Sequence, residues 1–308
     1  MYFIHFFELH HFWDCKKYCS WIVSALFLYF PSLVYSQPST HLNSPSLSPI
    51  QKGELLLAQS LNKEALELYQ SLIIAGNGDG YAFRGLVRAY QNMNKLEKAE
   101  SWVQEFLLND LDSSPALYAL GYVNYLKNNF QKAEKLFNQA IKLNSNNTLA
   151  LNNLGAVLAY QKLYTKAAEQ VREAIRLNPK EGMFFYNLEA IYKKMNDPNL
   201  IIDDYNLYLK QGNSNLIRGY GMAVGRNMRQ AGFKLYSQGR LDDAIQKFIE
   251  IEAVYKKILH EPGLVPVYFS LGLLHEEKGD LQVAKKYFNQ VLTLNPLHIQ
   301  AKERLKFF

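Results

Sequence analysis

The sequence predicts an all-α protein in which pairs of helices repeat along the chain and stack into a solenoid. Two series of residues carry this prediction, because members of both recur every 34 positions. The alanines of the first series are Ala65, Ala99, Ala133 and Ala167. The leucines of the second series are Leu86, Leu120, Leu154 and Leu188. Self-similarity at a fixed period of about 20–50 residues is typical of solenoids and related repeat architectures.

Each repeat is expected to contain two amphipathic helices. Within 114–147, apolar and small residues keep helical spacing on either side of an interruption at 128–129. Apolar residues at i, i+3, i+4 and i+7 place one face of each helix against its neighbours. Small residues such as Gly121 are expected where two helices cross closely, because a larger side chain would hold the backbones apart.

One equivalent position between the two helices of a unit often carries Asn or Gly. These residues are Asn94, Asn128, Asn196, Gly239 and Gly279. Both residue types accept the left-handed conformation that ends a helix, so we expect positive φ angles there. Pro179 and Pro296 are expected to lie beyond the second helices of their units, because proline cannot continue a helix.

A 34-residue helix–turn–helix unit with Leu-Gly, Ala, an aromatic residue, Ala and Pro in this order resembles the tetratricopeptide repeat. The resemblance implies a right-handed α-solenoid of about seven units with a C-terminal capping helix. The units are expected at 46–79, 80–113, 114–147, 148–181, 182–215, 225–258 and 265–298, and the capping helix at 297–308. The match is most specific in the units that begin at 114, 148 and 265, where Leu-Gly and Ala coincide.

The repeat is irregular in three places. Extra residues occur within 210–224 and at 259–264, and they form either longer helices with loops or a hinge in the stack. Unit 182–215 departs from the pattern, since Glu189 replaces the glycine and Ile201 the first alanine. We expect one continuous core, because each repeat buries its apolar face only on its neighbours.

The N-terminal residues have the order of a secretory signal. Lys16 and Lys17 precede an apolar stretch at 21–30, and Val34 and Ser36 suit the last positions before a cleavage site. We expect a signal peptide at 1–36, a Ser/Pro-rich linker at 37–49 and the repeat domain at 50–308. The alternative is an uncleaved segment that anchors the protein in a membrane. The expected location is therefore periplasmic or extracellular.

Composition and motifs argue against catalysis and against nucleic-acid binding. Both cysteines, Cys15 and Cys19, lie in the expected leader, so the mature chain would have no thiol chemistry. The formal charge of +6 includes no run of five or more Lys/Arg, unlike the clustered cations of a nucleic-acid footprint. None of the common nucleotide-binding, zinc-protease or serine-hydrolase motifs occurs. We expect no enzymatic activity, no metal site and no cofactor.

Some titratable residues invite a catalytic interpretation, but each has a structural explanation. The pairs Asp203-Asp204 and Asp242-Asp243 lie near the starts of second helices, where carboxylates favour the positive end of the helix dipole. His275 takes a position that apolar residues fill in other units, so we expect it to pack in the core.

The resemblance also implies that the first helix of each unit lines a concave groove for an extended peptide. The groove candidates are Arg84, Arg88, Tyr118, Tyr122, Tyr125, Asn152, Asn153, Tyr186, Asn187, Lys193, Arg226, Arg229 and Tyr236. Tyrosine offers a large contact area with a polar tip, and an asparagine amide both donates to and accepts from a peptide unit. Asn153 and Asn187 resemble a short piece of the asparagine ladder in O-linked N-acetylglucosamine transferase. The alternative is that these side chains only solvate an empty groove.

The leading functional interpretation is a non-catalytic scaffold or assembly factor in the cell envelope that binds protein or peptide partners. A non-catalytic subunit of an envelope enzyme or secretion complex is the alternative. An RNA-binding helical repeat of the pentatricopeptide kind is a third interpretation, but its period would be about 35 residues and an export signal argues against it.

We predict cleavage of the leader after Ser36, because the two lysines, the short apolar core and the small residue at the end suit signal peptidase. Intact-mass measurement of the protein exported by its native host should give the mass of 37–308. A chain that keeps residues 1–36 and pellets with membranes would replace cleavage with anchoring.

Overall fold

The computed structural model describes residues 47–308, and the regular structure there is α-helical throughout. Seven helical pairs follow one another, and we number them as units one to seven. The first helices are α2 (Pro49–Ala58), α4 (Gly80–Asn92), α6 (Ser114–Leu126), α8 (Thr148–Tyr160), α10 (Gly182–Lys194), α12 (Ser214–Ser237) and α14 (Glu261–Lys278). The second helices are α3 (Asn62–Ile74), α5 (Leu96–Asn109), α7 (Phe130–Leu143), α9 (Tyr164–Leu177), α11 (Leu200–Gln211), α13 (Leu241–Lys257) and α15 (Leu281–Leu294). A short helix, α16 (Ile299–Leu305), closes the series, so the predicted solenoid with a closing helix is confirmed.

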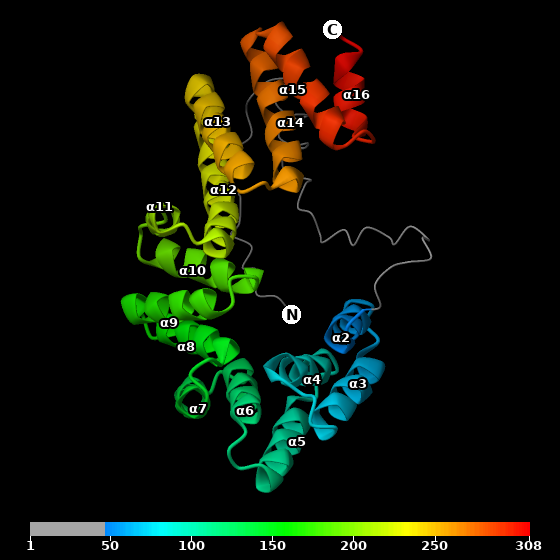
Figure 1. Cartoon of the computed structure of the whole chain (residues 1–308), viewed down its shortest axis with the longest axis vertical. Helices are drawn as coiled ribbons and strands as arrows, with labels where there is room; N and C mark the ends of the chain where they lie inside the picture. Colours follow the sequence, from blue (N-terminus) through cyan, green and yellow to red (C-terminus); the bar gives the residue numbers. More distant parts are fainter. Residues whose placement is uncertain (1–46) are drawn as a thin grey trace, which may run out of the picture.

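The helical pairs are stacked along a curved path (Figure 1). The first helices α4 and α6 lie on the inner side of the curve, and their partners α5 and α7 lie on the outer side. Successive first helices touch one another from α2 to α12, and the contacts of α14 with the preceding unit are mainly to α13. The first helices therefore supply a nearly continuous inner layer, on which the candidate site residues lie.

The predicted turn position has a positive φ angle in the units where we expected it. The φ angles are 57° at Asn94, 62° at Asn128, 60° at Asn196, 75° at Gly239 and 89° at Gly279. The same position in units one and four holds Ser60 and Lys162, with φ of 62° and 65°. These two residues are strained there, because a Cβ atom makes the left-handed region unfavourable. Residue type alone therefore did not reveal them.

The two helices of a unit cross closely at the predicted small residues. A Cβ atom on Gly121 would lie 2.7 Å from the Phe137 ring, and one on Gly155 would lie 2.5 Å from a Val171 methyl group. Carbon atoms do not approach so closely, so a side chain at either position would push the helices apart. The glycines are the reason that α7 and α9 lie against their partner helices at this distance.

The extra residues lengthen two first helices, in agreement with the first of the two expected alternatives, longer helices with loops. α12 begins at Ser214, well before the expected start at 225, and α14 begins at Glu261. Near the N-terminal end of α12, Gly219 packs against Phe185, and further along Gly225 packs against Tyr255 of α13. α12 therefore contacts both the preceding unit and its own partner helix. At the other end of the chain, α2 includes Pro49, so the predicted boundary at residue 50 is slightly late.

The apolar core has two parts, whereas we expected one continuous core. The first part comprises buried residues between 57 and 136, and the second comprises buried residues between 118 and 301. They meet in unit three, where the partly buried Leu117 and Tyr122 pack against both. The division arises because residues with some solvent exposure, not fully buried ones, join the two parts.

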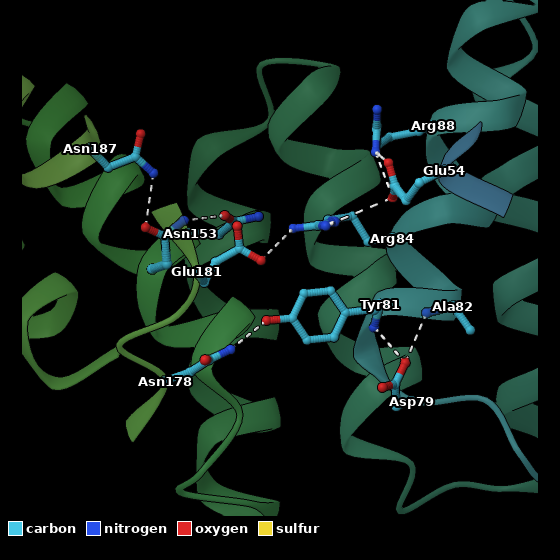
Figure 2. Close-up of polar contacts among 11 residues, drawn as sticks. Glu54, Asp79, Tyr81, Ala82, Arg84, Arg88, Asn153, Asn178, Glu181 and Asn187 are labelled. Carbon is cyan, nitrogen blue, oxygen red and sulfur yellow. Dashed lines mark hydrogen bonds and ion pairs between the residues drawn. The ribbon is translucent and has the colours of Figure 1, made fainter. Parts of the chain in front are cut away.

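Four side chains link unit two directly to the loop between α9 and α10, and we call them the clasp (Figure 2). The Asn178 amide donates a hydrogen bond of 2.7 Å to the Tyr81 hydroxyl, and the Arg84 guanidinium lies 3.6 Å from the Glu181 carboxylate. Each pair is 97 residues apart in sequence. Tyr81 also packs against the second part of the core, although α4 belongs to the first. The clasp therefore joins the two ends of the arc that runs from unit two to unit five.

The expected leader and most of the expected linker lie outside the described residues. No helix between residues 47 and 308 is long and apolar enough to cross a membrane.

We predict that Lys162→Gly stabilises the protein by about 0.5–1 kcal/mol, because glycine relieves the left-handed strain at little cost in contacts. Lys162 is exposed and forms no ion pair with a described residue. Urea unfolding followed by circular dichroism should show a higher midpoint. The matched control is Lys135→Gly at an exposed position inside α7, which should lower stability by about 1 kcal/mol. A lower midpoint for the Lys162 variant would contradict the prediction.

We predict that opening the clasp widens the separation of units two and five. The variant Tyr81→Phe/Glu181→Gln removes the hydrogen-bonding hydroxyl and the carboxylate while it keeps the side-chain volumes. Spin labels on cysteines introduced at the exposed Lys98 and Lys194 measure this separation by double electron–electron resonance. The distance distribution should become longer and broader in the variant. Tyr160→Phe/Glu169→Gln, two changes outside the clasp, should leave it unaltered, and an unaltered distribution in the clasp variant would show that packing alone sets the curvature.

A second test of the clasp uses pH. Burial, and next the negative charge of Glu181, raises the pKa of Tyr81 to about 12 from an ordinary value of 10.0. A raised folded-state pKa contributes stability that is complete below pH 10 and is lost as the pH rises towards 12. The spin-label distance should therefore lengthen between pH 10 and 12 in the native chain, with a smaller change in Tyr81→Phe.

Candidate functional site

The two candidate arginines of unit two are already ion-paired within the protein. The Arg88 guanidinium donates to Glu54 of α2 at 2.8 Å. Arg84 lies between Glu54 at 3.8 Å and Glu181 at 3.6 Å, and only 15% of its side chain is exposed (Figure 2). Two arginines thus face two carboxylates, so this end of the inner layer has little positive charge left for a ligand.

The tyrosines of unit three pack more deeply than an exposed groove would require. Tyr118 is buried, with its ring parallel to that of Tyr122 at 6.1 Å. Tyr125 packs edge to face against Phe130 at 5.8 Å. Burial raises the pKa of Tyr118 and of Tyr125. These rings serve the junction between the two parts of the core, and Tyr118 is not accessible to a peptide in this conformation.

The asparagines form hydrogen bonds with one another (Figure 2). The Asn187 amide of α10 donates to the Asn152 side-chain oxygen at 2.9 Å, and the Asn152 amide donates to Asn153 at 3.0 Å. Asn152 is fully buried, so the expectation that it lines an open groove is wrong. The reason is that its amide joins α8 to α10. Asn153 and Asn187 are half-buried, and gripping a peptide backbone would require them to exchange these bonds.

An exposed aromatic and basic surface begins at unit five. Tyr186 of α10 is 56% exposed, and the Arg226 guanidinium of α12 lies over its ring at 4.2 Å from the centroid. Arg226 also forms an ion pair with Glu189 of α10. Burial raises the pKa of Glu189, and the positive charge of Arg226 opposes this rise. Glu189, which replaces the usual glycine, therefore ties α10 to α12.

Further cations lie near Arg226 without a carboxylate of their own. Arg218 and Arg229 of α12 form no ion pair with any residue in the part of the chain that the structure describes. Burial, followed by the charges of Arg218 and Arg226, lowers the pKa of His260, so this imidazole is neutral at neutral pH. Arg229 and Arg226 both act electrostatically on Tyr255, which shows that the two arginines converge on the same region.

The last two candidates lie at the edges of this surface. The Lys193 amine of α10 donates to the Gln230 side chain of α12 at 3.2 Å. The Tyr236 hydroxyl donates to Glu277 of α14 at 2.7 Å, above a small apolar hollow between α12, α13 and α14. The hollow is lined by Phe233, Tyr236, Phe248, Ser270, Leu273, Leu274 and Glu277.

A buried polar cluster in unit five was not predicted from the sequence. Asp204 is buried, accepts a hydrogen bond from the Tyr192 hydroxyl and forms an ion pair with Arg172 at 3.1 Å. The expected interaction with the helix dipole does not fully explain Asp204, because its carboxylate also links α11 to Arg172 of α9 and Tyr192 of α10. The cluster lies where the repeat departs from its pattern, and the only available signal was that departure. His275 packs against Tyr287 at 5.7 Å, in agreement with the expectation for it.

Comparisons with known proteins find repeat models and solved structures that resemble this chain. Models of the tetratricopeptide repeat match residues 114–147 and 265–296. Among solved structures, YrrB, a TPR protein with an unusual peptide-binding site, shares 19% identity over 66% of this chain and 97% of YrrB, with a TM-score of 0.33. MamA shares 18% identity over 58% of this chain and 96% of its own, with a TM-score of 0.37.

A third similar structure is the C-terminal part of a TPR repeat-containing protein from Cytophaga hutchinsonii, with 14% identity over 82% of this chain and 98% of that one, and a TM-score of 0.42. The repeat models match two of the three units in which the pattern is most specific. Between these units the structure has the same helical pairs, with turns at equivalent positions. The chain therefore contains tetratricopeptide repeats within an all-α solenoid, and these repeats support a protein–protein interaction scaffold.

Proposed function

We propose that this protein is a non-catalytic scaffold or assembly factor that binds an extended segment of a partner protein on the inner side of its solenoid. The observation that carries the proposal is the exposed Tyr186 beside Arg226 and Arg229 on the first helices of units five and six. Aromatic residues and arginine supply most of the binding energy in protein interfaces. A rigid helical layer presents them with little loss of conformational entropy on binding.

Differences in charge and exposure along the inner layer support a narrower surface for such a segment. At unit two, Glu54 and Glu181 already form ion pairs with the arginines, and the clasp adds a hydrogen bond between Asn178 and Tyr81. At units five and six the aromatic ring is exposed, and the cations outnumber the carboxylates. We therefore place the partner segment on α10 and α12, with Lys193 and Tyr236 at its edges.

The family and the sequence both support a non-catalytic role. Tetratricopeptide-repeat proteins are typically non-catalytic, and the sequence has no recognised catalytic motif. A non-catalytic subunit of an envelope enzyme or secretion complex would use the same surface, and identification of the partner distinguishes it from a free-standing scaffold. Export to the cell envelope belongs to the proposal because of the leader-like order of residues 1–36.

Site-specific photocrosslinking in the native host tests the proposal. A photoreactive phenylalanine analogue at Tyr186 should crosslink to a defined partner protein, because that ring is exposed on the inner side. The matched control carries the same analogue at Lys166, an exposed position on the second helix α9, and should not crosslink to that partner.

Mass spectrometry of the crosslinked peptides then locates the contact within the partner. A contact confined to one short segment of the partner supports binding of an extended chain. Equal crosslinking from both positions, or crosslinking only from Lys166, would place the binding surface on the outer side and overturn the proposal.

A further inference from the structure

We propose that α12 carries a subsite for acidic side chains, so that the partner segment is recognised by its glutamates or aspartates. We call Arg218, Arg226 and Arg229, together with the Tyr186 ring, the arginine site. This inference rests on the proposed function and deepens it, because it assigns a chemistry to the partner and a role to one helix of the surface.

The three arginines lie on one face of a single continuous helix. Arg226 lies eight positions after Arg218, and Arg229 lies eleven positions after Arg218. Residues at these intervals lie on the same side of an α-helix. At about 1.5 Å per residue, Arg218 and Arg226 are about 12 Å apart along the axis. An extended peptide covers that span in about four residues, at about 3.3 Å each. Alternate residues of an extended chain share a face, so carboxylates two or four positions apart would meet the arginines together.

The charge of this region is poorly balanced within the protein. Of Arg218, Arg226, Arg229 and Lys193, only Arg226 forms an ion pair with a carboxylate among residues 47–308, and that carboxylate is Glu189. At unit two, by contrast, the arginines and the carboxylates are equal in number. The excess of positive charge on the inner layer therefore lies at units five and six. An incoming carboxylate would meet Arg218 and Arg229 without first breaking an ion pair.

Two buried polar atoms in the same place have no hydrogen-bond partner within the described part of the protein. The Arg226 Nε atom is buried and has no hydrogen-bond partner, and the same holds for the His260 Nδ1 atom. Because buried polar groups in proteins are almost always hydrogen-bonded, such atoms are places where a ligand can contribute. The guanidinium fork matches a carboxylate with two parallel hydrogen bonds, which a lysine cannot reproduce.

Tyr186 completes the site by fixing one of the cations. The Arg226 guanidinium lies over the tyrosine ring and forms an ion pair with Glu189. These two contacts fix the orientation of the guanidinium in the absence of a ligand. The exposed part of the ring also offers an apolar wall to the methylene groups of a glutamate. The arrangement favours an acidic peptide over RNA, since the cations form one short row on one helix and a carboxylate of the neighbouring helix, that of Glu189, pairs with one of them.

The test uses a fluorescein-labelled peptide of alternating Glu and Ser residues, with a Gln/Ser peptide of equal length as the uncharged probe. Fluorescence anisotropy with the purified full chain should show at least tenfold tighter binding of the Glu/Ser peptide at low salt. The preference should shrink in 0.5 M NaCl, where the Debye length is only a few ångströms. Arg218→Ala/Arg229→Ala should weaken binding of the Glu/Ser peptide by about tenfold, because each loses a charge-assisted hydrogen bond.

The matched control is Arg176→Ala/Arg240→Ala, which removes the same charge from an exposed position on α9 and from the exposed N-cap of α13, and it should change binding less than twofold. Equal weakening in the control variant would show attraction by net charge alone and would overturn the site. Binding of an oligouridylate as tightly as the Glu/Ser peptide, lost in the same variant, would assign the arginines to nucleic acid.

The outcome is separable from that of the proposed function. If the partner crosslinks from Tyr186 as strongly in the Arg218→Ala/Arg229→Ala chain as in the native chain, the scaffold role stands and the acidic subsite is wrong. If no partner crosslinks from Tyr186 in either chain, the scaffold surface itself is wrong.

Discussion

The close crossing of two helices within each unit is the constraint on which this structure depends. Gly121 and Gly155 let a bulky side chain of the second helix reach the backbone of the first. Gly272 does the same for Phe288 in the last unit. The crossing sets the thickness of each unit, and the thickness decides how the next unit is placed. A repeat that cannot bury its face alone thereby acquires a defined neighbour, and the inner layer of first helices follows from that repetition.

The sequence predicted the parts of the fold that local chemistry determines. The 34-residue spacing located the starts of α4, α6, α8 and α10 to the residue, because the turn position and the small residues recur together. Positive φ angles at Ser60 and Lys162 escaped prediction, since nothing in a serine or lysine indicates the left-handed region. There the neighbouring helices impose the conformation on a residue that does not favour it.

The candidate site was harder to predict, because it depends on contacts between residues far apart in the chain. Helical spacing correctly predicted that Asn152 and Asn153 lie on the first helix. It could not predict that the Asn152 side chain would accept a hydrogen bond from Asn187 of the next unit. In the same way, Arg84 looked like a free cation until the curvature brought Glu181 against it. Spacing within a helix therefore identifies which residues lie on a helix, whereas the superhelical path decides which of them remain available.

The inner layer consequently has two ends of different character. At one end, side chains from units two to five satisfy one another across the curve. At the other end, α10 and α12 expose an aromatic ring and cations without enough carboxylates. The arginines at unit two are ion-paired within the protein, whereas Arg218 and Arg229 of unit six form no ion pair with a described residue. Both situations arise on the same repeated scaffold, because the repeat determines the backbone and leaves the polar residues to vary.

The length of α12 affects how the chain would unfold. In a repeat array, stability is approximately the sum of the intrinsic stability of each unit and the interface between neighbours. A single helix of 24 residues that packs on unit five through Gly219 and on α13 through Gly232 belongs to both terms at once. Units five and six cannot unfold independently, because unfolding of either one removes packing contacts that stabilise the other. Units five and six are therefore expected to unfold as one cooperative block.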